Sequence, residues 1–290
     1  MEVRMDTYTK LKWLITKMVK RYSSHSLSTT SAYIAYYWVL AFFPFIIFVI
    51  SLLTYTNLPT GIFMEYVEEA IPKSVVPIVE STISQFIMYR SSTLVSVGGL
   101  VTLWSAGTAV NALIKGIHIA YSSNYVKPYF WARLVATCYT VLLAIVLILL
   151  MIGLVFGNRL GDYIFTMLDM NKGIVMPIWN LIRLVMPFIG LVLVMYLLYR
   201  VIPRKHLKDK NVWPGVIFTS VTWYLFSLVF SIYVDNYSKY NQLYGSIGSV
   251  FILLIWLYGS CTLLLLGAEM NAILQDAKIE QIHRRFNGKK

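Results

Sequence analysis

Long apolar runs alternate with short polar segments along the chain, and six of these runs are each about 20 residues long, the length that spans a bilayer core as an α-helix. Backbone groups inside lipid must satisfy their own hydrogen bonds, and the runs lack the period-two alternation of barrel strands. The predicted spans are residues 32–54, 94–113, 134–156, 177–199, 212–234 and 246–268. We therefore predict an all-α fold, a polytopic membrane helical bundle with six transmembrane helices.

Two polar segments outside these spans also predict helices. Within residues 8–22, five apolar side chains share one helical face and basic residues occupy the rest, which is typical of a helix lying in the membrane interface. The shared face consists of Leu11, Leu14, Ile15, Met18 and Tyr22. A simple anchor and a lipid-sensing role both fit this helix. Residues 61–89 are longer than a plain loop, and Pro72 and Pro77 divide them, so we expect an extracellular helical hairpin between the first two spans.

The resulting plan has three parts. Residues 1–31 form a cytoplasmic amphipathic segment, residues 32–271 form the membrane domain, and residues 272–290 form a basic cytoplasmic tail. The first span is too long, and its polar leader too extended, for a cleavable signal peptide.

Composition supports the membrane assignment. Hydrophobic residues make up 58% of the 290 residues and charged residues only 13%, with a mean hydropathy of +0.66. These values exclude a soluble globular protein, a disordered chain and a disulfide scaffold. The two cysteines, Cys138 and Cys261, fall inside apolar runs and are expected to be inert packing residues.

The net charge of +12 is unevenly distributed over the predicted loops. The two terminal segments and the loops after spans two and four carry 19 Lys and Arg residues, and the opposite side carries five. The positive-inside rule therefore places both termini in the cytoplasm. Basic residues beside a membrane favour anionic lipid headgroups, rather than nucleic acid, as partners.

A stripe of small residues marks the second span at three- and four-residue steps, which lets neighbouring backbones approach closely. It runs through Gly99, Thr102, Ala106, Ala109, Ala112 and Gly116. The stripe indicates a central packing helix, with a pore lining as the alternative, and it also leaves homo-oligomerisation open.

Two charged residues stand out at the spans. Arg183 lies about six residues into span four, where a cation faces protein or water, or reaches back to the outer headgroups. In a cavity it would suit an anionic group such as a phosphate or carboxylate, which makes it a tentative substrate-binding residue. Glu269 ends span six and could pair with a basic residue of an inner loop, for example Lys115; this structural pair is favoured over a transport carboxylate.

The outer end of span six begins in a stretch rich in Tyr, Asn and Ser. An aromatic belt at the membrane interface is the favoured interpretation. A polar rim over a cavity is the alternative, in which Tyr240, Asn241 and Tyr244 would contact substrate.

Patterns that would indicate an enzyme are missing from the sequence. The four histidines, His25, His118, His206 and His283, lack metal-ligand spacing to one another or to Cys and carboxylates. No P-loop is present, and no Ser-His-Asp pattern occurs in a plausible context. We expect neither enzyme activity nor a metal or cofactor.

Three motifs carry a resemblance to a known family. The first is residues 35–44, AYYWVLAFFP, ending in Pro44; the second is residues 104–107, WSAG, continuing through Lys115 to Tyr121. The third is residues 240–248, YNQLYGSIG, which includes Gly245, followed by residues 254–258, LIWLY, and 267–272, GAEMNA. Together they resemble the YihY/virulence factor BrkB family over about residues 10–275.

The resemblance implies a multi-pass protein of the bacterial cytoplasmic membrane and supplies no agreed catalytic residues. Some family members are linked to serum resistance or lipid export, and an older ribonuclease label is regarded as a misassignment. His118 stands where Asn is common in the family. The favoured hypothesis is a transporter or flippase-like protein for an amphipathic anionic lipid or solute. An envelope-organising, partner-binding protein is the alternative, and a membrane-bound ribonuclease is remote.

Overall fold

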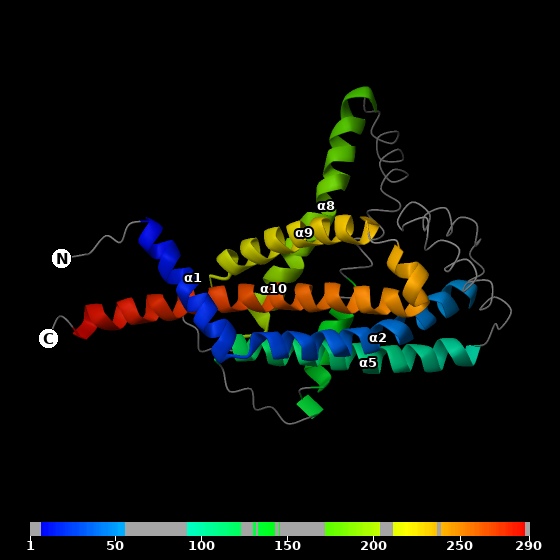
Figure 1. Ribbon diagram of the computed structural model, residues 1–290, viewed down its shortest axis with the longest axis horizontal. Helices are drawn as coiled ribbons and strands as arrows, with labels where there is room; N and C mark the ends of the chain where they lie inside the picture. Colours follow the sequence, from blue (N-terminus) through cyan, green and yellow to red (C-terminus); the bar gives the residue numbers. More distant parts are fainter. Residues whose placement is uncertain are drawn as a thin grey trace. The chain divides into compact units, whose positions relative to one another are not determined.

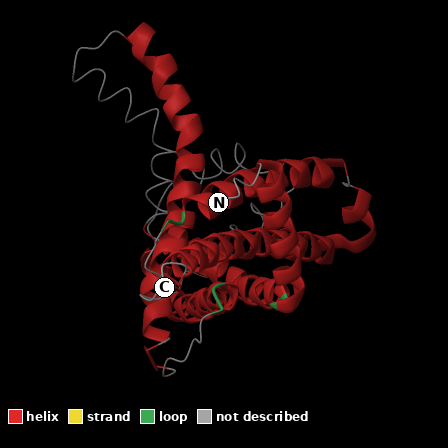
Figure 2. Cartoon of the chain, turned by 90° about the vertical axis from the view of Figure 1, so that its left-hand side faces the viewer, coloured by secondary structure: helices red, strands yellow, loops and turns green. Residues whose placement is uncertain are grey.

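The computed structural model describes residues 7–55, 92–122, 130–131, 133–142, 145, 172–203, 211–236 and 239–287. Helix dominates these residues and no strand occurs among them (Figure 2). The all-α prediction is confirmed for this part of the chain. The hairpin predicted over residues 61–89 lies outside the described residues.

Each predicted span coincides with a helix over all or part of its length. The helices are α1 (Thr7–Ser24), α2 (Leu27–Tyr55), α5 (Ser92–Ala120), α8 (Lys172–Val201), α9 (Trp213–Asn236) and α10 (Lys239–Asn287), as labelled in Figure 1. Within the described residues, three stretches are long and apolar enough to cross a membrane: Ser96–Ala120, Trp213–Val234 and Val250–Lys278. Arg133–Leu142 and Val185–Val201 are shorter apolar helices.

Four helices extend at least five residues beyond the predicted span boundaries: α2, α5, α8 and α10. The second helix begins at Leu27 rather than at residue 32, because Leu27 and Ser31 are themselves fully buried and belong to the packed part of the helix. The last helix continues to Asn287, because the sequence between Gly267 and Gly288 contains no glycine or proline to end it.

The chain divides into two compact units. The first comprises residues 1–36, 111–132 and 185–290; within it α9 packs along α10, and α1 packs against α10. Its buried apolar side chains include Leu27, Ile34, Leu113, Ile117 and Leu265.

The second unit comprises residues 37–110 and 133–184. Within it, the Arg133 guanidinium lies 4.0 Å from the centre of the Trp104 ring. The same guanidinium donates hydrogen bonds to the Thr108 hydroxyl at 2.6 Å and to the Trp104 carbonyl at 2.5 Å. These contacts fasten the start of the helix at Arg133 to α5.

The amphipathic helix predicted near the N-terminus is present as α1, which contains no acidic residue. Its apolar face has a half-buried part and an exposed part, which lie side by side along the helix. Leu14, Met18 and Tyr22 are half-buried. Leu11 and Ile15 are exposed, and they continue into an exposed edge that also contains Tyr8 and Val19. We call these four residues the open edge of α1.

Candidate functional site

The helices α9 and α10 approach each other closely at two glycines, Gly215 and Gly267. A Cβ at Gly267 would overlap the Thr219 hydroxyl and would lie 2.7 Å from the Tyr199 hydroxyl and 3.0 Å from the Gly215 carbonyl. A Cβ at Gly215 would overlap the Gly267 carbonyl and the Asn271 side chain. Only glycine therefore lets the two helices meet here, as small residues do in membrane helix pairs.

Polar side chains bridge the helices beside this contact. The buried hydroxyls of Tyr199 and Thr219 are 2.8 Å apart, and the Tyr199 hydroxyl donates to the Leu264 carbonyl at 2.7 Å. On the other side, the Gly215 amide donates to Asn271 Oδ1 at 2.7 Å. Hydrogen bonds of this kind hold apolar helices together where the hydrophobic effect cannot.

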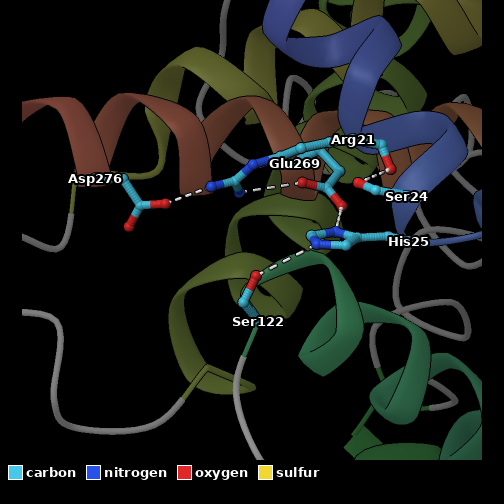
Figure 3. A network of polar contacts seen from close by, with 6 residues as sticks. All are labelled: Arg21, Ser24, His25, Ser122, Glu269 and Asp276. Atoms are coloured by element: carbon cyan, nitrogen blue, oxygen red, sulfur yellow. Dashed lines mark hydrogen bonds and ion pairs between the residues drawn. The ribbon is translucent and has the colours of Figure 1, made fainter.

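A polar network joins α1, the turn after it, α5 and α10 around Glu269, which is 0% exposed (Figure 3). Arg21 Nη1 lies 3.3 Å from Glu269 Oε2, and His25 Nδ1 lies 2.5 Å from Glu269 Oε1. Arg21 Nη2 also reaches the exposed Asp276 at 2.5 Å, and His25 Nε2 lies 3.5 Å from the Ser122 hydroxyl. Both carboxylate oxygens of Glu269 thus have a cationic or hydrogen-bonding partner, as a buried carboxylate requires.

The geometry of the turn between α1 and α2 places His25 in this network. His25 N donates to the Arg21 carbonyl at 2.9 Å, which extends the helical bonding by one residue. Ser26 then adopts a φ of 49°, a left-handed conformation typical of a residue that ends a helix. The chain therefore turns into α2 directly after the histidine.

Polar groups near the network are also buried. The Tyr121 hydroxyl faces the Asn271 side chain, and burial raises the pKa of Tyr121 above its ordinary value, so this hydroxyl stays neutral at physiological pH. Gln275 Oε1 has no hydrogen-bond partner among the described residues. Buried polar atoms ordinarily have a partner, so Gln275 Oε1 marks a place where water or a polar ligand group would be stabilised.

The structure gives Glu269 different partners from the one suggested by its sequence position. Lys115 was the example of an inner-loop partner, but its side chain is exposed, and the partners found are Arg21 and His25. The reason is the turn at His25 and Ser26, which carries the end of α1 back to α10. Sequence reasoning missed Arg21 and His25, since neither has a local spacing that relates it to residue 269.

For the remaining tentative site residues, the structure describes the helix in which each lies but not the side chain. Arg183 lies in α8, and Tyr240, Asn241, Tyr244 and Gly245 lie in the first turns of α10. Their side chains are outside the described set. These residues remain predictions.

The small-residue stripe is buried along part of its length, whereas Pro44 and Gly99 are only half-buried. Pro44 lies inside α2 and is half-buried, as is Gly99 in α5. Further along the stripe, Ala109 and Ala112 are buried, and a Cβ at Gly116 would lie 2.8 Å from Ile34 and 3.0 Å from Leu265. This burial agrees with the packing interpretation of the stripe.

Comparison with known proteins connects this architecture to a family. The family model described as virulence factor BrkB matches residues 18–288. A protein of Bacillus subtilis (strain 168) named ribonuclease-like protein YfkH is 31% identical over 264 residues, covering 91% of this chain and 96% of the relative. UPF0761 membrane proteins of Aggregatibacter aphrophilus and Aeromonas salmonicida are each 24% identical, covering 97% and 88% of this chain and 96% and 87% of the relatives.

No solved structure matches the chain. The family match covers nearly all described helices, including α1 from Met18 onward, the turn at His25 and the whole of α10 to Asn287. The chain therefore belongs to the virulence factor BrkB (YihY/UPF0761) family of membrane proteins.

Proposed function

We propose that this protein is a transporter or flippase-like protein that moves an amphipathic anionic lipid or solute across a bacterial cytoplasmic membrane. We further propose that the chain crosses the membrane six times and that both of its termini lie in the cytoplasm. The activity involves no covalent chemistry.

One observation carries the proposal: the apolar span Val250–Lys278 buries a carboxylate and two amides, those of Glu269, Asn271 and Gln275. Ionisable and polar groups are costly in a membrane helix and mark substrate or ion pathways. Among the described residues Gln275 Oε1 has no hydrogen-bond partner, so this atom is available to a polar ligand group.

The open edge of α1 supports an anionic lipid as the partner. Tyr8 and Val19 are 73% and 66% exposed, and the lysines Lys12, Lys17 and Lys20 are exposed on the same helix. Apolar side chains beside lysines, with no acidic residue, favour the acyl-headgroup boundary of an anionic leaflet.

The open edge also favours the second candidate function, a partner-binding protein that organises the envelope. Exposed apolar side chains in a row would serve a partner helix as well as lipid. Stable co-purification of one partner, without movement of lipid or anion in vesicles, would support this alternative over transport.

The test uses proteoliposomes that contain fluorescently labelled phosphatidylglycerol or a labelled anion. Wild type, Arg183→Ala and empty vesicles are compared for movement across the bilayer. We expect protein-dependent movement that decreases in Arg183→Ala. Movement that survives the substitution would keep transport and remove Arg183 from the site, and no movement of any anionic probe would refute the proposal.

The position of α1 is tested in the same vesicles. Lys12→Gln combined with Lys17→Gln should reduce the dependence of movement on anionic lipid content, because these lysines contribute about 1 kcal/mol each near an anionic surface. Lys115→Gln is the matched control, since Lys115 is an exposed lysine on α5. Equal effects of both changes would assign the lipid dependence to overall charge rather than to α1.

A further inference from the structure

We propose that Glu269 and His25 form a proton-binding pair that loads from the exposed Ser122 side, and that this proton is the coupling ion of transport. The coupling part rests on the function proposed above. The proton-binding part does not, because it follows from the contacts of the polar network alone.

The first step is the tautomer of His25. When Glu269 is ionised, its carboxylate can only accept hydrogen bonds, so His25 Nδ1, 2.5 Å from Glu269 Oε1, then carries a hydrogen. In the neutral ring this leaves the lone pair on Nε2. The proton taken up by the pair therefore binds at Nε2.

The second step is access. His25 Nε2 lies 3.5 Å from the hydroxyl of Ser122, which is exposed in the turn after α5 (Figure 3). A serine hydroxyl both donates and accepts, so it can face Nε2 before and after protonation. A buried carboxylate is thereby linked to the protein surface through one imidazole ring.

The third step is the charge of the network. One guanidinium, Arg21, is shared by two carboxylates, Glu269 at 3.3 Å and Asp276 at 2.5 Å. Tyr121, in the turn directly after α5, also senses the charge of Glu269, and its own hydroxyl is neutral. With a neutral imidazole the network has one excess negative charge, and a proton on His25 removes it. A proton on the imidazole therefore gives each of the two carboxylates a cationic partner.

The consequence is a reversible charge change at the end of a membrane span. The protonated network has one positive partner for each carboxylate, and the deprotonated network does not. Since α1 is fastened to α10 through these contacts, proton binding strengthens the attachment of α1 and proton release weakens it. A transporter needs such a difference between loaded and unloaded states to couple an ion to movement.

The proton site is tested by nuclear magnetic resonance of the full chain in nanodiscs, with nitrogen-15 in its four histidines. The His25 signals are those that disappear in His25→Gln. We expect the neutral ring of His25 to carry its hydrogen on Nδ1, and this preference to disappear in Glu269→Gln.

Ser24→Ala is the matched control, because the Ser24 hydroxyl bonds only to the Arg21 carbonyl, at 3.5 Å, and should leave the His25 signals unchanged. Ser122→Ala is a mild second variant that should change the Nε2 signal without affecting the fold. A neutral His25 ring with its hydrogen on Nε2, or a preference for Nδ1 that is unchanged in Glu269→Gln, would overturn the proton site.

The coupling is tested separately, with labelled phosphatidylglycerol in proteoliposomes under an imposed pH gradient. We expect the gradient to accelerate movement in wild type and in Ser24→Ala, and this acceleration to be lost in His25→Gln. Lipid movement whose rate does not depend on the pH gradient would refute the coupling but would leave the transport function supported. The nuclear magnetic resonance signature without any movement would support the proton site and refute the transport function.

Discussion

Replacing Gly267 with alanine tests the contact on which the α9–α10 pair depends. The added methyl group would overlap the Thr219 hydroxyl and crowd the Tyr199 hydroxyl and the Gly215 carbonyl. Two of the three obstacles are hydrogen-bonded and one is backbone, so none can move without breaking a contact or separating the helices. The expected result is a protein that folds less stably.

The magnitude follows from three contributions. Overpacking costs about 1–3 kcal/mol, and weakening the Tyr199–Thr219 hydrogen bond costs about 1 kcal/mol. Alanine recovers about 1 kcal/mol over glycine in a helix. The net loss is about 1–3 kcal/mol, which corresponds to a fall in Tm of about 2–10 °C.

Gly107→Ala is the matched control, because it is the same substitution inside another apolar helix. Its Cβ would meet Thr137 Oγ1 at 3.5 Å and Arg133 Cζ at 3.8 Å, which are ordinary contacts. We expect its Tm to be unchanged or raised by a few degrees, since only the helix propensity of alanine remains, about 1 kcal/mol.

Thermal unfolding of both variants in the same detergent, followed by intrinsic fluorescence and by the fraction remaining monodisperse, gives the comparison. A Tm of Gly267→Ala equal to or above that of Gly107→Ala would refute the reasoning, because it would mean that α9 and α10 do not approach each other at these glycines.

Three further changes test other contacts, each by thermal unfolding. Arg21→Ala should cost about 3 kcal/mol, because it leaves the buried Glu269 without its guanidinium; a loss below that of Asp276→Asn would contradict the role of the buried carboxylate. Tyr199→Phe should cost about 1–2 kcal/mol, because the Leu264 carbonyl loses its donor; an unchanged Tm would show that the carbonyl has another partner. Arg133→Lys should cost about 1–2 kcal/mol, because lysine cannot make both hydrogen bonds and cover the Trp104 ring, whereas Lys115→Arg at an exposed position should change little.

Local patterns in the sequence were sufficient to predict the apolar helices and the amphipathic helix α1. The apolar runs place α5, α9 and α10 correctly, and the amphipathic spacing places α1, since both depend only on neighbouring residues. The ends of α2, α5, α8 and α10 were misplaced by five residues or more. Hydropathy shows where apolar residues stop, and a helix can continue past that point.

Of the residues in the polar network, the sequence predicted only Glu269 as a site residue. Its position in an apolar helix marks it, but the 244 residues that separate it from His25 give no signal to a single sequence. Gly215 and Asn271 form a similar long-range pair, 56 residues apart. Such contacts are decided by the packing of helices, which hydropathy and spacing do not encode.

The last helix has a mechanical consequence. Its 49 residues form one α-helix, which bends in its first turns (Figure 1). At 1.5 Å per residue its path is about 70 Å, well beyond the roughly 45 Å of a bilayer with its headgroups. The long part after the bend can pivot as a unit, so a small tilt at one end becomes a larger sideways displacement at the other. Arg21 of α1 contacts Glu269 and Asp276 partway along α10. A tilt of α10 within the bilayer would therefore be transmitted to α1 and to the end of α10 in the water.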